Sequence, residues 1–180
     1  MNQIAMPFSS YERFYETISE NTEDFLCNLI IQPGQIILGL PKDTEVPEGL
    51  PGEITVVNTG HKGGIIIGFA ESITVFAFTE HPWNAPFLRK VRDYLRSAGL
   101  DAEIDNNDLV ISGVHKIAGT SSMFVPGIGK YFYGIHISIN LDRDVIGSVC
   151  SKKSGKIPTG LSEFGVSRSD ILRVLNIIDL

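Results

Sequence analysis

The sequence predicts an α+β fold in which helices flank a largely antiparallel sheet. Its 180 residues are enough to bury the core of one domain, and its 43% hydrophobic and 20% charged residues are typical of a globular protein. Strand-like segments occur in groups with helical segments between them, without the regular β–α–β alternation that parallel sheets require. We therefore expect a single domain over residues 1–180.

The expected helices are bounded by capping signals. Ser9 opens a capping box before an apolar face, and Ser167 opens another before the last helix. A second helix is expected over Ala85–Ala98 and should end at Gly99, and a short one over Asp142–Val149. The buried positions predicted for the second and last helices are Phe87, Val91, Tyr94, Leu95, Ile171, Val174, Leu175 and Ile178.

Strands are expected where apolar residues alternate with polar ones or form short runs between turn residues. Before the second helix these segments are Gln35–Leu40, Glu53–Asn58, Ile65–Phe69 and Ser72–Thr79. Tyr131–Asn140 gives the clearest alternation, with Ile135, Ile137 and Ile139 on one side. Such alternation predicts a strand with one buried face.

Composition excludes several classes of protein. The net charge of −6 is concentrated in an acidic N-terminal third, which argues against a nucleic-acid-binding surface. The apolar runs are too short for a membrane span, and the N-terminus lacks the features of a signal peptide. Cys27 and Cys150 lack redox spacing, so a cytoplasmic protein is expected. The four histidines lack metal-ligand spacing, so no resident metal is expected.

The segment Asn107–Gly119 predicts a hairpin with the two-residue turn Ser112–Gly113. In that register Leu109 lies opposite Lys116, so Lys116 shares an apolar face of the ribbon. An ammonium on such a face is costly unless an anion meets it, which makes Lys116 a candidate ligand contact. The alternative is an ordinary edge ribbon with a solvated lysine.

The turn Gly60-His61-Lys62-Gly63-Gly64 joins two of the expected strands and holds three glycines. Glycines let backbone N–H groups approach an anion or a flat ligand closely, and His61 and Lys62 could add positive charge. These five residues are therefore candidate substrate- or nucleotide-binding residues. The alternative is a tight hairpin with no ligand.

Cys150 is a candidate nucleophile, because Lys152 and Lys153 follow it and nearby ammoniums favour the reactive thiolate. The alternative is a small buried hydrophobic residue. The basic groups Arg89–Arg92 and Lys152–Lys156 are either solvated surfaces or docking sites for an acidic partner.

The run Asn107-Asp108-Leu109-Val110, followed by a short turn and Lys116-Ile117-Ala118-Gly119, resembles the signature of lipoate-protein ligases. It is similar, more loosely, to biotin-protein ligases and octanoyltransferases. The resemblance extends more weakly over Glu53–Ile171. It implies the catalytic-domain fold of those enzymes, with Lys116 as the catalytic lysine at the acyl carbonyl and phosphate.

The same resemblance implies that Asn107, Asp108 and Gly119 lie beside the substrate or nucleotide. The implied activity attaches a lipoyl- or octanoyl-type acyl group to a lysine of a carrier domain through an acyl-adenylate. ATP and Mg²⁺ would be required, and lipoate, octanoate or biotin would be the acyl substrate. Gly63 and Gly64 match the glycine-rich loop of the family. The paired arginines of that loop are missing here, and Asn58 and Thr59 fall near their positions.

Two alternatives stay open within this resemblance. Gly155–Leu161 resembles the segment after the catalytic cysteine of octanoyltransferases, although Ser151 rather than glycine follows Cys150. A transferase of that kind would take the acyl group from an acyl carrier protein on Cys150, without ATP and with Lys116 as general base. The other alternative is a non-catalytic ligand-binding or interaction member with the same fold.

Overall fold

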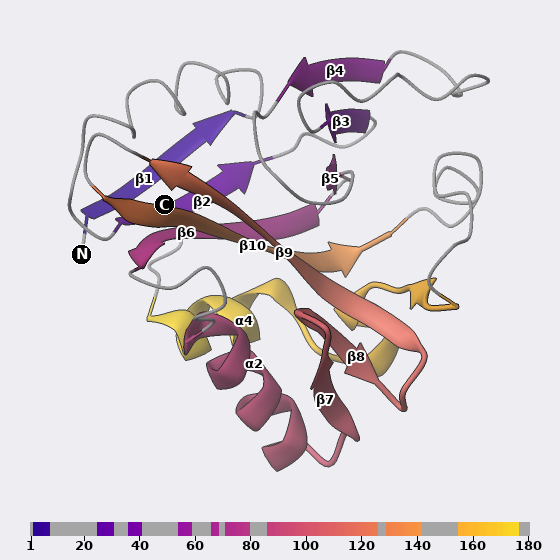
Figure 1. Cartoon of the computed structure of the whole chain (residues 1–180). Helices are drawn as coiled ribbons and strands as arrows, with labels where there is room; N and C mark the ends of the chain where they lie inside the picture. The colour runs from indigo at the N-terminus through magenta and orange to yellow at the C-terminus, as the bar shows by residue number, and fades with distance from the viewer. Residues whose placement is uncertain are drawn as a thin grey trace.

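A six-stranded, largely antiparallel sheet is the main feature of the computed structural model (Figure 1). The structure describes residues 2–7, 25–30, 36–40, 54–58, 66–68, 71–79, 86–125, 129–141 and 155–176. In chain order the elements are β1 (Asn2–Pro7), β2 (Phe25–Ile30), β3 (Ile36–Leu40), β4 (Ile54–Asn58), β5 (Ile66–Gly68), β6 (Glu71–Thr79), α2 (Pro86–Ser97), β7 (Ala102–Asp105), β8 (Asp108–Ile111), β9 (His115–Val125), β10 (Lys130–Asn140), β11 (Ile157–Pro158), the 3-10 helix η2 (Leu161–Phe164) and α4 (Arg168–Leu175).

The strand order of the large sheet is β6-β10-β9-β8-β7, with β11 paired to β9 in parallel. Two smaller sheets contain the parallel pair β1-β2 and the strands β4-β3-β5. Figure 1 shows α2 and α4 together on one side of the large sheet, and β2 lies beside β6 at the edge of that sheet. The predicted α+β class is confirmed.

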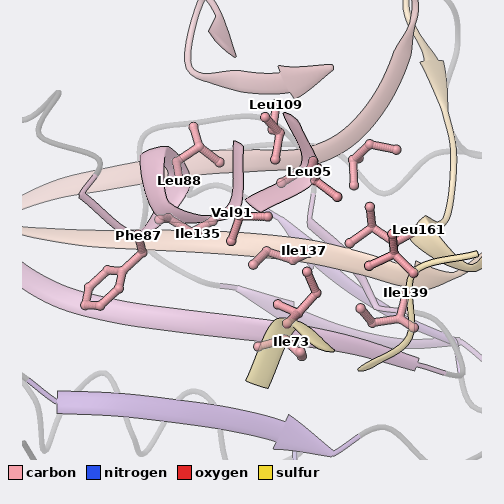
Figure 2. Close-up of a cluster of buried hydrophobic side chains, with 14 of the residues drawn as sticks. Ile73, Phe87, Leu88, Val91, Leu95, Leu109, Ile135, Ile137, Ile139 and Leu161 are labelled. Atoms are coloured by element: carbon pink, nitrogen blue, oxygen red, sulfur yellow. The ribbon is translucent and has the colours of Figure 1, made fainter. Parts of the chain in front are cut away.

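The core lies between the two helices and the large sheet. In Figure 2 the buried side chains of α2 lie over those of β10, and β6, β8 and η2 add further members. The labelled residues are Ile73, Phe87, Leu88, Val91, Leu95, Leu109, Ile135, Ile137, Ile139 and Leu161. The predicted apolar faces of α2 and β10 are therefore confirmed, with Tyr94 partly buried at the edge. Full burial of one such side chain stabilises the fold by about 1.5–3 kcal/mol.

The predicted caps at Gly99 and Ser167 are present. Gly99 has φ +86°, its N–H donates to the Arg96 carbonyl, and the next N–H donates to the Leu95 carbonyl, which ends α2 in a Schellman motif. Ser167 and Asp170 form the capping box of α4. Hydrogen bonds from Ser167, and more weakly the charge of Arg173, lower the pKa of Asp170 below its ordinary range.

The faces of α4 match the prediction in part. Ile171 and Leu175 are buried as expected, Leu172 is buried although it was not predicted, and Val174 is only half-buried. Ile178 lies outside the described residues. No helix in the described ranges is long and apolar enough to cross a bilayer.

The predicted strands before α2 are confirmed as β3 to β6, with ends shifted by one residue at most. The strands β1 and β2 were not predicted, and β7 was not either. The helix expected after Ser9 and the one over Asp142–Val149 lie outside the described residues.

The predicted register of the β8–β9 hairpin is wrong by one residue. Ser112 and Gly113 do have positive φ, +52° and +70°, but Val114 joins them in a three-residue turn, so Ile111 pairs with His115. Val110 therefore lies opposite Lys116, and Leu109 pairs with Ala118. Ile117 is the extra residue of a β-bulge at this point.

Candidate functional site

The β7–β8 hairpin places two carboxylates beside each other. Asn106 and Asn107 form its two-residue turn with φ of +47° and +71°, both in the left-handed region that a type I′ turn requires. Asp105 and Asp108 are the cross-strand pair that flanks this turn. Like charges at such positions repel, so the hairpin needs a cation here.

Lys156 supplies that cation. Its Nζ lies 2.8 Å from Asp105 Oδ2 and 3.0 Å from Asp108 Oδ2, and it donates to the Asp105 backbone carbonyl at 3.1 Å. Burial is the largest single influence on this ammonium and acts to lower its pKa. The hydrogen bonds and charges of Asp105 and Asp108 together outweigh it, so the pKa of Lys156 lies above the ordinary value of 10.5.

The short strand β11 fixes Lys156 beside the hairpin. The Ile157 N–H donates to the Val114 carbonyl at 2.8 Å, and the Thr159 N–H donates to the Lys116 carbonyl at 2.9 Å. The buried Thr159 hydroxyl donates to the Ile157 carbonyl, and His115 Nδ1 lies 3.1 Å from the same hydroxyl oxygen. The hydroxyl has a single proton, so Nδ1 of His115 is the donor in the second bond.

Lys116 reaches the same carboxylate from β9. Lys116 Nζ lies 2.8 Å from Asp108 Oδ1. Asp108 and Val110 alternate with Leu109 along β8, and Lys116 is opposite Val110, so the observed register directs Lys116 toward Asp108. The predicted register would have directed it to the face of Leu109, which belongs to the core. Lys116 is therefore not on the apolar core face, contrary to the prediction.

A glycine keeps this site open. A Cβ atom at Gly119 would lie 3.3 Å from both Cε and Nζ of Lys116 and 3.6 Å from Asp108 Oδ1. Any side chain at this position would press on the ion pair. Gly119 therefore leaves space at the Lys116 ammonium.

The two lysines differ in what they offer a ligand. The Lys116 side chain is 37% exposed and that of Lys156 is 11% exposed. An ammonium has three N–H donors, and Asp108 is the acceptor of Lys116 within the described part of the chain. Lys116 can thus donate to an incoming carboxylate, phosphate or acyl carbonyl while Lys156 stays on the hairpin.

The structure brings four of the predicted site residues together: Lys116, Asp108 and Gly119 in direct proximity, and Asn107 in the adjoining turn. The other candidates lie outside the described residues, namely Gly60, His61, Lys62, Gly63, Gly64 and Cys150. Whether the Gly63–Gly64 turn shares a concave site with Lys116 stays a prediction.

Lys156 and Asp105 were not predicted as site residues. The sequence places Lys156 in a basic group that was interpreted as a solvated surface or a docking site, whereas its side chain is mostly buried. The available signal was the run Asp105-Asn106-Asn107-Asp108. Two asparagines suit a type I′ turn, and the flanking carboxylates then require a cation.

No protein-family model and no curated protein matches the sequence. Solved structures do match it. Lipoate-protein ligase A bound with ATP has a TM-score of 0.68 and 17% identity, over 97% of this chain and 81% of that one. The bipartite lipoate protein ligase of Thermoplasma acidophilum, studied with its E2 lipoyl domain, has a TM-score of 0.67 and 17% identity, over 99% and 85%.

Biotin protein ligase from Aquifex aeolicus matches less well, with a TM-score of 0.54 and 14% identity, over 98% of this chain and 66% of that one. The chain has the fold shared by lipoate-protein and biotin-protein ligases. The fold that the sequence resemblance implied is therefore confirmed.

Proposed function

We propose that the protein attaches a lipoyl- or octanoyl-type acyl group to a lysine of a small carrier domain, in the manner of a lipoate-protein ligase. The observation that carries this proposal is the partly exposed Lys116 side chain, whose ammonium is held 2.8 Å from Asp108 beside Gly119. The ligase fold supports it, because Lys116 occupies the motif by which the sequence resembles those enzymes.

The reaction has two steps. First, a carboxylate oxygen of the acid attacks the α-phosphorus of ATP, the bond to pyrophosphate breaks, and an acyl-adenylate forms. Second, the amine of the carrier lysine attacks the acyl carbonyl carbon, the bond to AMP breaks, and the amine loses a proton to solvent. ATP is a substrate here, and Mg²⁺ accompanies its phosphates and balances part of their charge.

Lys116 would act in both steps. Negative charge develops on the phosphate oxygens in the first step and on the acyl oxygen in the second. A positively charged donor beside these oxygens stabilises such charge. Asp108 holds the Lys116 ammonium beside Gly119 before a ligand arrives, and the absence of a side chain at Gly119 leaves room for the acyl-phosphate group.

The partner in this proposal is a lipoyl-type carrier domain. The T. acidophilum ligase, which has the same fold, was studied with its E2 lipoyl domain. The exposed basic residues Arg89 and Lys90 on α2 form a surface with the charge that an acidic carrier domain would bind.

The test is transfer of octanoate, lipoate or biotin to a recombinant carrier domain, measured as a mass increase on the carrier lysine. We expect transfer that requires ATP and falls about 100-fold or more in Lys116→Met, the cost of removing one such donor. Arg173→Met removes an exposed cation on α4, outside the site and the carrier surface, and should leave the rate unchanged.

Three other outcomes would contradict the ligase proposal. Transfer from an octanoyl carrier protein without ATP, with an octanoyl mass on Cys150 and loss of activity in Cys150→Ser, would establish the transferase instead. Absence of both reactions, with one of the acids still raising the melting temperature, would establish a non-catalytic binding protein. Full activity in Lys116→Met would remove Lys116 from the mechanism.

A further inference from the structure

The carboxylate of Asp108 is shared between two ammoniums, one on each oxygen. Lys116 Nζ is on Oδ1 at 2.8 Å, and Lys156 Nζ is on Oδ2 at 3.0 Å. Lys156 also binds Asp105, so the four side chains form one group with two positive and two negative charges. The net charge of the group is therefore zero before any ligand arrives.

An anionic ligand must compete with Asp108 for the Lys116 ammonium. When Lys116 turns toward a phosphate or carboxylate, Asp108 loses the partner on Oδ1. The Asp108 side chain is only 17% exposed, and a carboxylate with so little solvent is costly to leave unpaired. Lys156 stays on Oδ2, so the carboxylate remains compensated while Lys116 moves.

We propose that Lys156 is a positioning residue that holds Asp108 and the Asn106–Asn107 turn in place while Lys116 transfers its hydrogen bond from Asp108 to the ligand. This inference rests on the proposed function, since it assigns Lys156 a part in the same reaction. Its anchor is the β11 pairing, which fixes the backbone next to Lys156 against Lys116 itself.

A purely structural ion pair makes a different prediction. Loss of Lys156 would then loosen the hairpin and expose Lys116 without changing how strongly Asp108 attracts it. If Lys156 shares Asp108, its loss leaves Lys116 as the remaining described cation on that carboxylate. Lys116 would then be held more closely on Asp108, and its amine would be less available to acylating reagents.

The experiment has one arm that needs no ligand. The rate of Lys116 acetylation by an N-hydroxysuccinimide ester is followed by mass spectrometry at fixed pH and low ionic strength. In Lys156→Met we expect the rate at Lys116 to fall about threefold or more, and in Lys156→Arg to stay near that of the wild type. Lys90 in the same digest is the internal control, because it is exposed on α2. An unchanged or faster rate at Lys116 in Lys156→Met overturns the proposal.

A second variant serves as the control for folding. Asp105→Asn combined with Lys156→Met removes one carboxylate of the repelling pair together with the lysine. Asp108 then still has Lys116 as its described cation, so slow acetylation of Lys116 is expected again. If Lys156→Met alone does not fold, this double variant decides the question.

The second arm is the transfer reaction. We expect kcat to fall about tenfold in Lys156→Met, with most of the activity recovered in Lys156→Arg, which keeps the positive charge. Equal rates in the wild type and Lys156→Met overturn the positioning role. If the wild type transfers no acyl group, the proposed function fails, and the acetylation arm alone decides whether Lys156 shares Asp108.

Discussion

The two faces of β8 have different physical roles. Leu109 and Ile111 belong to the buried core that the helices cover, whereas Asp108 pairs with two lysines. The core face depends on volume, since interior side chains are close-packed. The other face carries the buried Val110 beside the ion pairs of Asp108, and paired charges contribute little net stability because desolvation opposes their attraction. Leu109 and Ile111 of the core and the ion-paired Asp108 therefore lie on opposite faces within four residues.

The largest expected effect is on the core face. We expect Leu109→Ala to lower the free energy of unfolding by about 2–5 kcal/mol, because a fully buried leucine leaves a cavity. Urea unfolding followed by circular dichroism measures this. Val114→Ala, at an exposed site on the same hairpin, should change it by less than about 0.5 kcal/mol. Similar losses in both variants would contradict the assignment of Leu109 to the core.

The next effect belongs to Lys156 and depends on pH. Because its folded-state pKa is raised above 10.5, its contribution is fully present below that pH and is lost as the pH rises through the folded pKa. We expect Lys156→Met to cost about 1–3 kcal/mol at neutral pH. The difference from the wild type should shrink above about pH 10.5. Unfolding series at increasing pH measure the difference, and a gap that grows with pH would refute it.

A smaller effect is expected in the Asn106–Asn107 turn. Asn107→Ala should cost about 1 kcal/mol, because alanine is strained at φ +71°, whereas Asn107→Gly should cost much less. The Asn107→Gly variant thus keeps the turn conformation while it removes the side chain that a ligand could contact. If Asn107 also contacts a nucleotide, Asn107→Gly keeps its melting temperature but binds ATP more weakly. Equal stability of the alanine and glycine variants would contradict the turn geometry.

The smallest expected effect on stability is at the residue most important for the proposed reaction. Lys116→Met should change the free energy of unfolding by less than about 1 kcal/mol, because Lys116 is partly exposed and Asp108 keeps Lys156. Chemical unfolding measures this beside the transfer assay. A loss of several kcal/mol would show that Lys116 is structural and would remove the contrast between the two faces of β8.

Local signals in the sequence were sufficient for much of the fold. Gly99 ends α2 and Ser167 begins α4 because capping depends on residues within one turn of the helix. The alternation in β10 is equally local. The register of the β8–β9 hairpin was missed because a third turn residue and the bulge at Ile117 leave no comparable local signal.

The candidate site was predictable only where its motif is continuous in sequence. Lys116 and Asp108 belong to one hairpin, so the resemblance pointed to both. Lys156 lies 48 residues from Asp108, and no pattern around it distinguishes a buried lysine from a solvated one. Its position beside Asp108 becomes visible only when β11 pairs with β9.

That separation has a consequence for how the protein folds. The β7–β8 hairpin is local and is expected to form within microseconds, whereas the Lys156–Asp108 pair must wait for closure of a 48-residue loop. Until then Asp105 and Asp108 repel each other at the turn. We expect refolding to show the β7–β8 hairpin before the four-charge group is complete.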